Sequence, residues 1–84
     1  MELDKARIEI NTIDKEMVKL LEKRFNLVLQ IGQYKKDNSI PVYDEVREKK
    51  VIESCVNNLE NNMYSQHIEA IYKQIMNTCK ELEK

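Results

Sequence analysis

The sequence has very few residues that interrupt a helix. Among 84 residues there is a single glycine, Gly32, and a single proline, Pro41. Two such residues are too few for the turns of a β-sheet protein. We therefore predict an all-α chain, and its length fits a single domain over residues 1–84.

Charge excess, aromatic residues and long apolar runs are also scarce. The 14 Lys and Arg residues oppose 15 Asp and Glu residues, there is one Phe, and there is no Trp. A chain without a basic excess or stacking aromatics is not expected to bind nucleic acid. No apolar run approaches the roughly 20 residues of a membrane span, and the charged first residues lack the apolar stretch of a signal peptide. We therefore expect a soluble cytoplasmic protein with no membrane partner.

Residues that bind metals or act as nucleophiles form no recognisable site. Cys55 and Cys79 form no CxxC pattern, and the only histidine, His67, has no partner at zinc spacing. We expect both cysteines to be reduced and packed against apolar neighbours. The sequence also has no glycine-rich phosphate loop and no Ser/His or Cys/His nucleophile pattern. We expect no metal and no cofactor.

Apolar periodicity divides the chain into three expected helices. The first covers about residues 3–38 and ends ahead of Pro41, the second follows Asp44 as N-cap and ends near residue 58, and the third covers about 63–83. The heptad seam of the first helix consists of Leu3, Ala6, Ile10, Ile13, Met17, Leu20, Arg24, Leu27, Ile31 and Tyr34. The buried face of the third is expected to consist of Tyr64, Ile68, Ile71, Tyr72, Ile75, Met76 and Cys79.

The first helix is too long for one chain to cover. About 36 residues at 1.5 Å each span roughly 54 Å, whereas a compact chain of this length has a radius of gyration of about 12 Å. A second chain should cover the rest of the seam. We predict an intertwined two-fold homodimer with antiparallel first helices.

Two cations of the first helix occupy unusual positions. Arg24 stands in the apolar seam, where an unpaired charge is costly. Lys35 is eleven residues on and only about 20° away around the helix, and Gly32 lies near the same face. The charge of Arg24 in the seam can be explained by snorkelling of its side chain to solvent, by an internal salt bridge or by a bound ligand. The missing side chain at Gly32 can be explained by the need for space for a ligand or by close packing of another helix.

The second and third helices also carry charges on their inward stripes. Asp44, Arg47 and Glu48 share a face with apolar positions, and Glu83 prolongs the stripe of the third helix. A capped first turn with its own ion pair can explain the first three, and fraying at the chain end can explain Glu83. Taken together, these charges predict a site between the helices for a small, anionic, hydroxylated ligand, acting through positioning and electrostatics.

Five motifs stand out in one register along the chain. They are Arg7-x6-Asp14, Leu20-Leu21-x2-Arg24, Ile31-Gly32-x2-Lys35, Pro41-Val42-x-Asp44-x2-Arg47-Glu48 and Ile75-Met76-x2-Cys79. Together they resemble the all-helical (AroQ-class) chorismate mutases over essentially the whole chain. The resemblance implies a homodimer of three-helix subunits that rearranges chorismate to prephenate, as an isomerase without a cofactor, on the route to phenylalanine and tyrosine.

The resemblance also implies roles for the charged side chains at the site. Arg24 and the partner subunit's Arg7 would grip the two carboxylates of chorismate, and Arg47 would set the charge around them. Asp44 and Glu48 would hold the ring hydroxyl. The spacing supports the role of the partner subunit's Arg7. Arg7 and Arg24 are 17 residues apart and therefore roughly 25 Å apart along one helix, so they cannot hold the same small molecule unless Arg7 comes from the second chain.

Three further positions complete the implied site. Lys35 would donate to the ether oxygen of chorismate, where negative charge develops. Cys79 stands where the family usually has Ser, and Glu83 stands where it usually has Gln as a second donor to the ether oxygen. Because an ionised Glu cannot donate a hydrogen bond, we expect Glu83 to act in its protonated form.

Two other functions fit a chain of this pattern. An isochorismate pyruvate lyase of the same fold would have a similar pocket, although its substrate carries the hydroxyl elsewhere than Asp44 and Glu48 require. A weakly active module that binds a larger shikimate-pathway enzyme is the second alternative.

Overall fold

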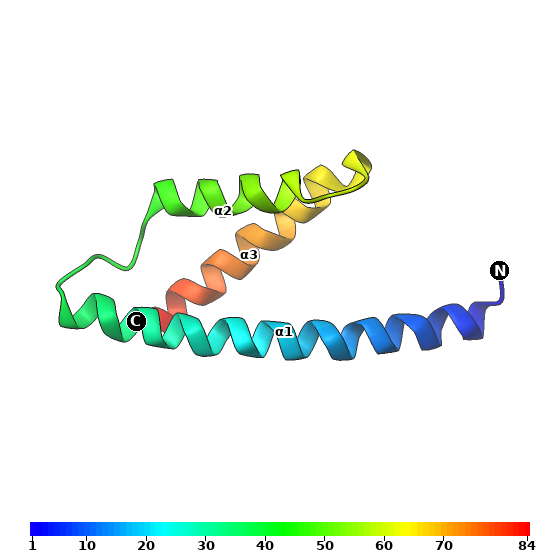
Figure 1. Cartoon of the computed structure of the whole chain (residues 1–84), viewed down its shortest axis with the longest axis horizontal. Coiled ribbons are helices and arrows are strands. Elements are labelled where there is room, and N and C mark those ends of the chain that lie inside the picture. The colour runs from blue at the N-terminus through cyan, green and yellow to red at the C-terminus, as the bar shows by residue number, and fades with distance from the viewer.

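The computed structural model describes residues 1–84 and contains only helices (Figure 1). The elements are α1 (Leu3–Asp37), α2 (Glu45–Asn57), a short 3-10 helix (Asn62–Tyr64) and α3 (Ser65–Glu83). The predicted all-α class with three helices is confirmed. None of the helices combines the length and the apolar character needed to cross a membrane.

The C-terminal end of α1 is closed by local polar contacts. The Asn38 side chain donates a hydrogen bond to the Tyr34 carbonyl oxygen at 2.8 Å, and Lys35 and Lys36 place positive charge on the last turn. Ser39 then adopts a left-handed backbone with φ of 53°, which turns the chain away before Pro41. These contacts explain why α1 ends at Asp37, one residue before the predicted boundary.

Side-chain caps set the starts of the later elements. Asp44 Oδ1 accepts a hydrogen bond from the Arg47 backbone N–H at 3.0 Å, so Asp44 is the N-cap of α2, as predicted. Asn61 Oδ1 accepts from the Met63 N–H at 3.0 Å and starts the 3-10 helix. Because of this extra turn, α3 begins at Ser65 and not at the predicted residue 63.

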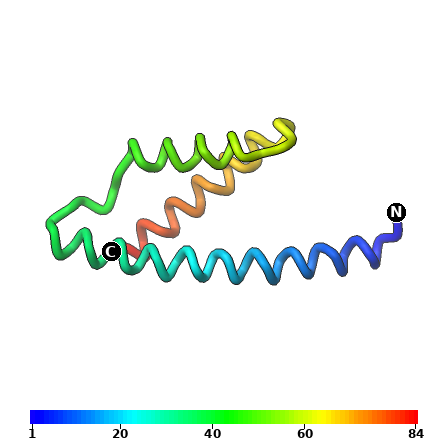
Figure 2. Tube along the Cα trace, viewed as in Figure 1, coloured from blue at the N-terminus to red at the C-terminus, as the bar shows by residue number.

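Helix α3 packs against both other helices. It runs obliquely from the end of α2 to the second half of α1, and the first half of α1 extends beyond it (Figures 1 and 2). The chain is 54 Å long, and its radius of gyration of 15.8 Å exceeds the roughly 12 Å of a compact chain of this length. A single chain is therefore far from compact.

Few residues are buried in the single chain. Only five of the 84 are, and most apolar seam positions of α1 are exposed, Leu20 and Leu27 among them. The prediction that Tyr64 and Ile71 are buried is wrong, since they are 48% and 53% exposed. Both follow the apolar period from which the third helix was predicted, but Tyr64 lies in the 3-10 helix, and both side chains are left largely exposed by the single chain.

Gly32 lies at the closest approach of α1 and α3. A Cβ atom at this position would lie 2.9 Å from Glu83 Cα and 3.1 Å from the Glu83 carbonyl oxygen. These are backbone atoms, which cannot move aside as a flexible side chain can. Close helix packing therefore accounts for Gly32, and the same approach places Glu83 against α1.

We expect Gly32→Ala to destabilise the protein. Alanine is the better helix former by about 1 kcal/mol, but separating two packed helices costs about 1–3 kcal/mol. Urea unfolding at a fixed chain concentration should therefore show a lower midpoint than for the wild type. An equal or higher midpoint would show that α1 and α3 can part here at little cost.

Candidate active site

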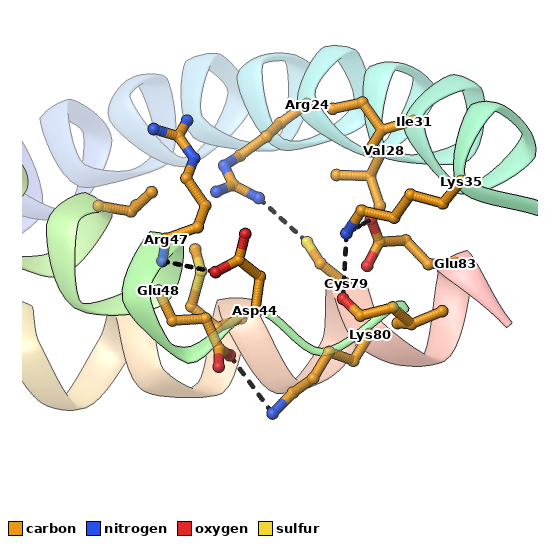
Figure 3. Close-up of a pocket in the computed structure, with 13 residues that line it drawn as sticks. Arg24, Val28, Ile31, Lys35, Asp44, Arg47, Glu48, Cys79, Lys80 and Glu83 are labelled. Atoms are coloured by element: carbon orange, nitrogen blue, oxygen red, sulfur yellow. Dashed lines mark hydrogen bonds and ion pairs between the residues drawn. The ribbon is translucent and has the colours of Figure 1, made fainter. Parts of the chain in front are cut away.

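A cavity of about 210 Å³ lies where the three helices meet (Figure 3). Helix α1 supplies one wall, the first turns of α2 the second, and the last turns of α3 the third. The lining residues are Arg24, Val28, Ile31, Lys35, Val42, Asp44, Arg47, Glu48, Val51, Met76, Cys79, Lys80 and Glu83. Seven of the eight residues assigned to the site from the sequence therefore line one pocket, and the eighth is Arg7.

Arg24 reaches into the pocket from α1 without a carboxylate partner. Its Nη1 donates a hydrogen bond to the Cys79 sulfur at 3.0 Å. None of the six ion pairs of the structure includes Arg24. The internal salt bridge considered for Arg24 is therefore absent, and its charge is free to bind an anion. Cys55 and Cys79 form no disulfide with each other.

Lys35 lies on the same face of α1 as Arg24, and two acceptors hold its ammonium group. Its Nζ lies 3.0 Å from Glu83 Oε1 and 3.0 Å from the Val42 carbonyl oxygen. The side chains of Lys35 and Glu83 are only 18% and 10% exposed. Glu83 is thus a buried pocket residue in the last turn of α3, and the fraying considered for it is not observed.

The first turn of α2 presents two carboxylates and one guanidinium. The capping interaction fixes Asp44, while Glu48 Oε1 lies 3.3 Å from Lys80 Nζ on α3. Arg47 forms no ion pair with either carboxylate, so the internal ion pair considered as an explanation for this turn is not formed. In Figure 3 the guanidinium groups of Arg47 and Arg24 reach toward the same region between α2 and α1.

Lys80 is a charged pocket residue that was not predicted from the sequence. It is four residues after Met76, and the spacing rule that selected Glu83 could have selected it too. Val28 and Val42 were also missed. Val28 lies off the heptad seam, and Val42 lies in the connection between α1 and α2, whose path no periodicity predicts.

Arg7 lies on the first turns of α1, away from the pocket of its own chain. It is 17 residues before Arg24, which corresponds to roughly 25 Å along the helix axis. The two guanidinium groups of one chain therefore cannot contact the same small molecule.

The pocket carries a net positive charge. Four cations line it, against three carboxylates. The cations are Arg24, Lys35, Arg47 and Lys80, and the carboxylates are Asp44, Glu48 and Glu83. Because Arg24 and Arg47 have no ion-pair partner, the arrangement favours an anionic ligand that also offers a hydroxyl donor to the carboxylates.

Tyr72 on α3 interacts with the charge of Arg24 and is itself neutral. Burial raises the pKa of its hydroxyl above the ordinary value of 10.0, a hydrogen bond and charge interaction with Cys55 raise it further, and Arg24 lowers it. The opposing effect of Arg24 is the smallest of these, so the phenol stays protonated at neutral pH. It therefore does not neutralise the Arg24 charge.

The structure contains no group of three or more His, Cys, Asp or Glu side chains that could hold a metal ion.

Comparison with known proteins shows the family to which this chain is similar. The family described as Chorismate mutase type II matches residues 6–84. A bifunctional chorismate mutase/prephenate dehydratase of Buchnera aphidicola (Acyrthosiphon pisum subspecies) is 39% identical over 83 residues, which cover 93% of this chain and 22% of that protein. A protein of the same name from Aquifex aeolicus is 32% identical over 88 residues, which cover 99% of this chain and 24% of that protein.

The relatives therefore match this chain over most of its length, while the chain spans only about a quarter or less of theirs. The T-protein of Haemophilus influenzae is 35% identical over 52 residues, which cover 62% of this chain and 14% of that protein. The family match covers both ends of the pocket, from the helix that carries Arg24 to the last turn with Glu83. This chain belongs to the type II chorismate mutase family.

Proposed function

We propose that this chain is a chorismate mutase, an isomerase that rearranges chorismate to prephenate in the biosynthesis of phenylalanine and tyrosine. One observation carries the proposal beyond family membership. Two unpaired guanidinium groups, a largely buried lysine and two carboxylates, supplied by α1 and by the start of α2, line a single small pocket that α3 closes. A dianion with a ring hydroxyl and an ether oxygen can use each of these groups.

Substrate binding follows from the charges in the pocket. Arg24, with Arg47 nearby, receives a carboxylate of chorismate, and the Cys79 thiol lies at the same end, already in contact with Arg24. Asp44 and Glu48 accept the hydrogen bond of the ring hydroxyl. The clamped carboxylates hold the enolpyruvyl group over the ring in the compact chair that the rearrangement requires.

A second chain completes this site in the proposal. The partner subunit's Arg7 supplies the grip on the other carboxylate, because Arg7 of the same chain is too far away. The exposed apolar seam of α1 and the elongated single chain support an intertwined homodimer. Burial of that seam provides a driving force for association of about 25 cal/mol per Å² of apolar surface.

Lys35 provides the main electrostatic contribution to the reaction. As the C–O bond breaks ahead of C–C bond formation, negative charge grows on the ether oxygen. An ammonium group has three N–H donors, and two of those on Lys35 are engaged by Glu83 and the Val42 carbonyl. The third is available for the ether oxygen, and the two fixed contacts hold it in place before the charge develops.

Glu83 leads to a prediction about its replacement by glutamine. Its ionised carboxylate would repel the charge on the ether oxygen and partly neutralise Lys35, whereas an amide at this position can donate a hydrogen bond. We therefore expect Glu83→Gln to raise kcat/KM, as measured by initial rates at neutral pH.

The matched control is Glu81→Gln, two residues earlier on α3. Glu81 is an exposed carboxylate that also pairs with a lysine, Lys84, at 3.1 Å. This variant should keep the wild-type kcat/KM. An equal or lower kcat/KM in folded Glu83→Gln would remove Glu83 from this role.

Product identity tests the proposed reaction against the lyase of the same fold. Purified chain should be given chorismate and isochorismate separately, and the products separated by chromatography. We expect prephenate from chorismate. Salicylate and pyruvate from isochorismate, with no prephenate, would instead identify the lyase.

A further inference from the structure

Lys80 is a pocket residue to which the family resemblance gives no role. It follows Cys79 on α3, and its Nζ lies 3.3 Å from Glu48 Oε1 and 4.6 Å from the centre of the Tyr43 ring. The Lys80 and Glu48 side chains are 28% and 20% exposed, so this ion pair is shielded far more than those on the surface of the helices. Lys80 thus connects α3 to α2 and to the connection before α2.

Glu48 needs such a partner more than Asp44 does. The two carboxylates are one turn apart on α2 and repel each other. Asp44 is fixed by its hydrogen bond with the Arg47 N–H, whereas Lys80 is the single cation within ion-pair distance of Glu48. In Figure 3 the Asp44 carboxylate points toward Arg24, and the Glu48 carboxylate points toward Lys80.

Lys80 lies on the helix that connects the two other walls of the pocket. Helix α3 packs against both α1 and α2, so it links the helix that carries Glu48 to the one that carries Arg24 and Lys35. The face of the Tyr43 ring also attracts the ammonium group and restrains it. One oxygen of Glu48 is thereby bound, and the other is available to accept a hydrogen bond.

We propose that Lys80 is a positioning residue that holds Glu48 as an ionised acceptor for the ring hydroxyl of the substrate. This inference rests on the proposed function. It gives Lys80 no contact with the reacting atoms. Because the hydroxyl takes no part in bond breaking, its hydrogen bond contributes equally to the bound substrate and to the transition state.

The first test compares Lys80→Met with Lys80→Arg in steady-state kinetics with chorismate. Loss of the cation should raise KM about tenfold with a smaller change in kcat, the signature of lost uniform binding. Arginine keeps the charge and should restore most of the affinity. The control is Lys73→Met, the same change on the same helix at an exposed Lys73–Glu69 pair of 3.2 Å, which should leave KM unchanged. Lys80→Gln replaces Lys80→Met if thermal melting shows that the latter is unfolded.

The second test asks whether Lys80 acts through Glu48. In a Glu48→Gln background, Lys80→Met should change KM by less than about twofold, because the carboxylate it positions is already gone. An equal factor in both backgrounds, or wild-type KM in Lys80→Met, would overturn the role of Lys80 while wild-type activity stands. A folded wild-type chain that does not convert chorismate would overturn the proposed function and this inference with it.

Discussion

Homodimers of Arg7→Ala and of Arg24→Ala should each be nearly inactive, and a mixture of the two should regain activity. Each change removes a charge-assisted grip on a substrate carboxylate, which we expect to lower kcat/KM by roughly a hundredfold or more. In a mixed dimer, one site keeps both arginines and the other has neither. Random mixing gives half mixed dimers, so roughly a quarter of all sites should work.

The measurement is the specific activity after joint refolding of equal amounts of the two variants. Separately refolded variants mixed without exchange are the control, and differently tagged chains establish that mixed dimers have formed. Specific activity near a quarter of the wild-type value is expected. Proven mixed dimers without recovery would show that each chain builds its own site.

Replacing Lys35 should damage turnover much more than substrate binding. Negative charge on the ether oxygen appears mainly in the transition state, so Lys35→Met should lower kcat by about 10²–10³ and change KM far less. The matched control is Lys36→Met, the neighbouring lysine, which is exposed and lies outside the pocket.

Initial rates over a range of chorismate concentrations separate the two parameters. Because Lys35 also pairs with buried Glu83, unfolding of each variant should be measured beside its kinetics. Unchanged kcat with a raised KM in folded Lys35→Met would remove Lys35 from the stabilisation of the ether oxygen.

Much of the site could be predicted from spacing because helices convert sequence distance into direction. Lys35 shares a face with Arg24 after eleven residues, and Glu83 continues the stripe of Met76 and Cys79. The structure places all of them around one pocket. A polar residue that continues the apolar stripe of a helix was therefore the feature of the sequence that identified pocket residues.

Other features depend on how helices cross, which periodicity does not specify. The contact of Lys80 with Tyr43 needs the path of residues 38–44 and the angle of α3. Burial was wrong at Tyr64 and Ile71, because an apolar period identifies a face but not whether the same chain covers it. Likewise, the choice between ligand space and close helix packing as the reason for Gly32 depends on the position of Glu83 on α3, which the sequence does not give.

In our proposal this pocket, completed by the partner subunit's Arg7, rearranges chorismate without a metal or a cofactor. The most direct measurement follows the loss of chorismate absorbance with purified wild-type chain and with Lys35→Met, in the presence of a metal chelator and with no cofactor added. We expect rapid loss with stoichiometric prephenate for the wild type and almost none for the folded variant. Equal rates for the two chains, or a wild-type rate no higher than the uncatalysed background, would contradict the proposal.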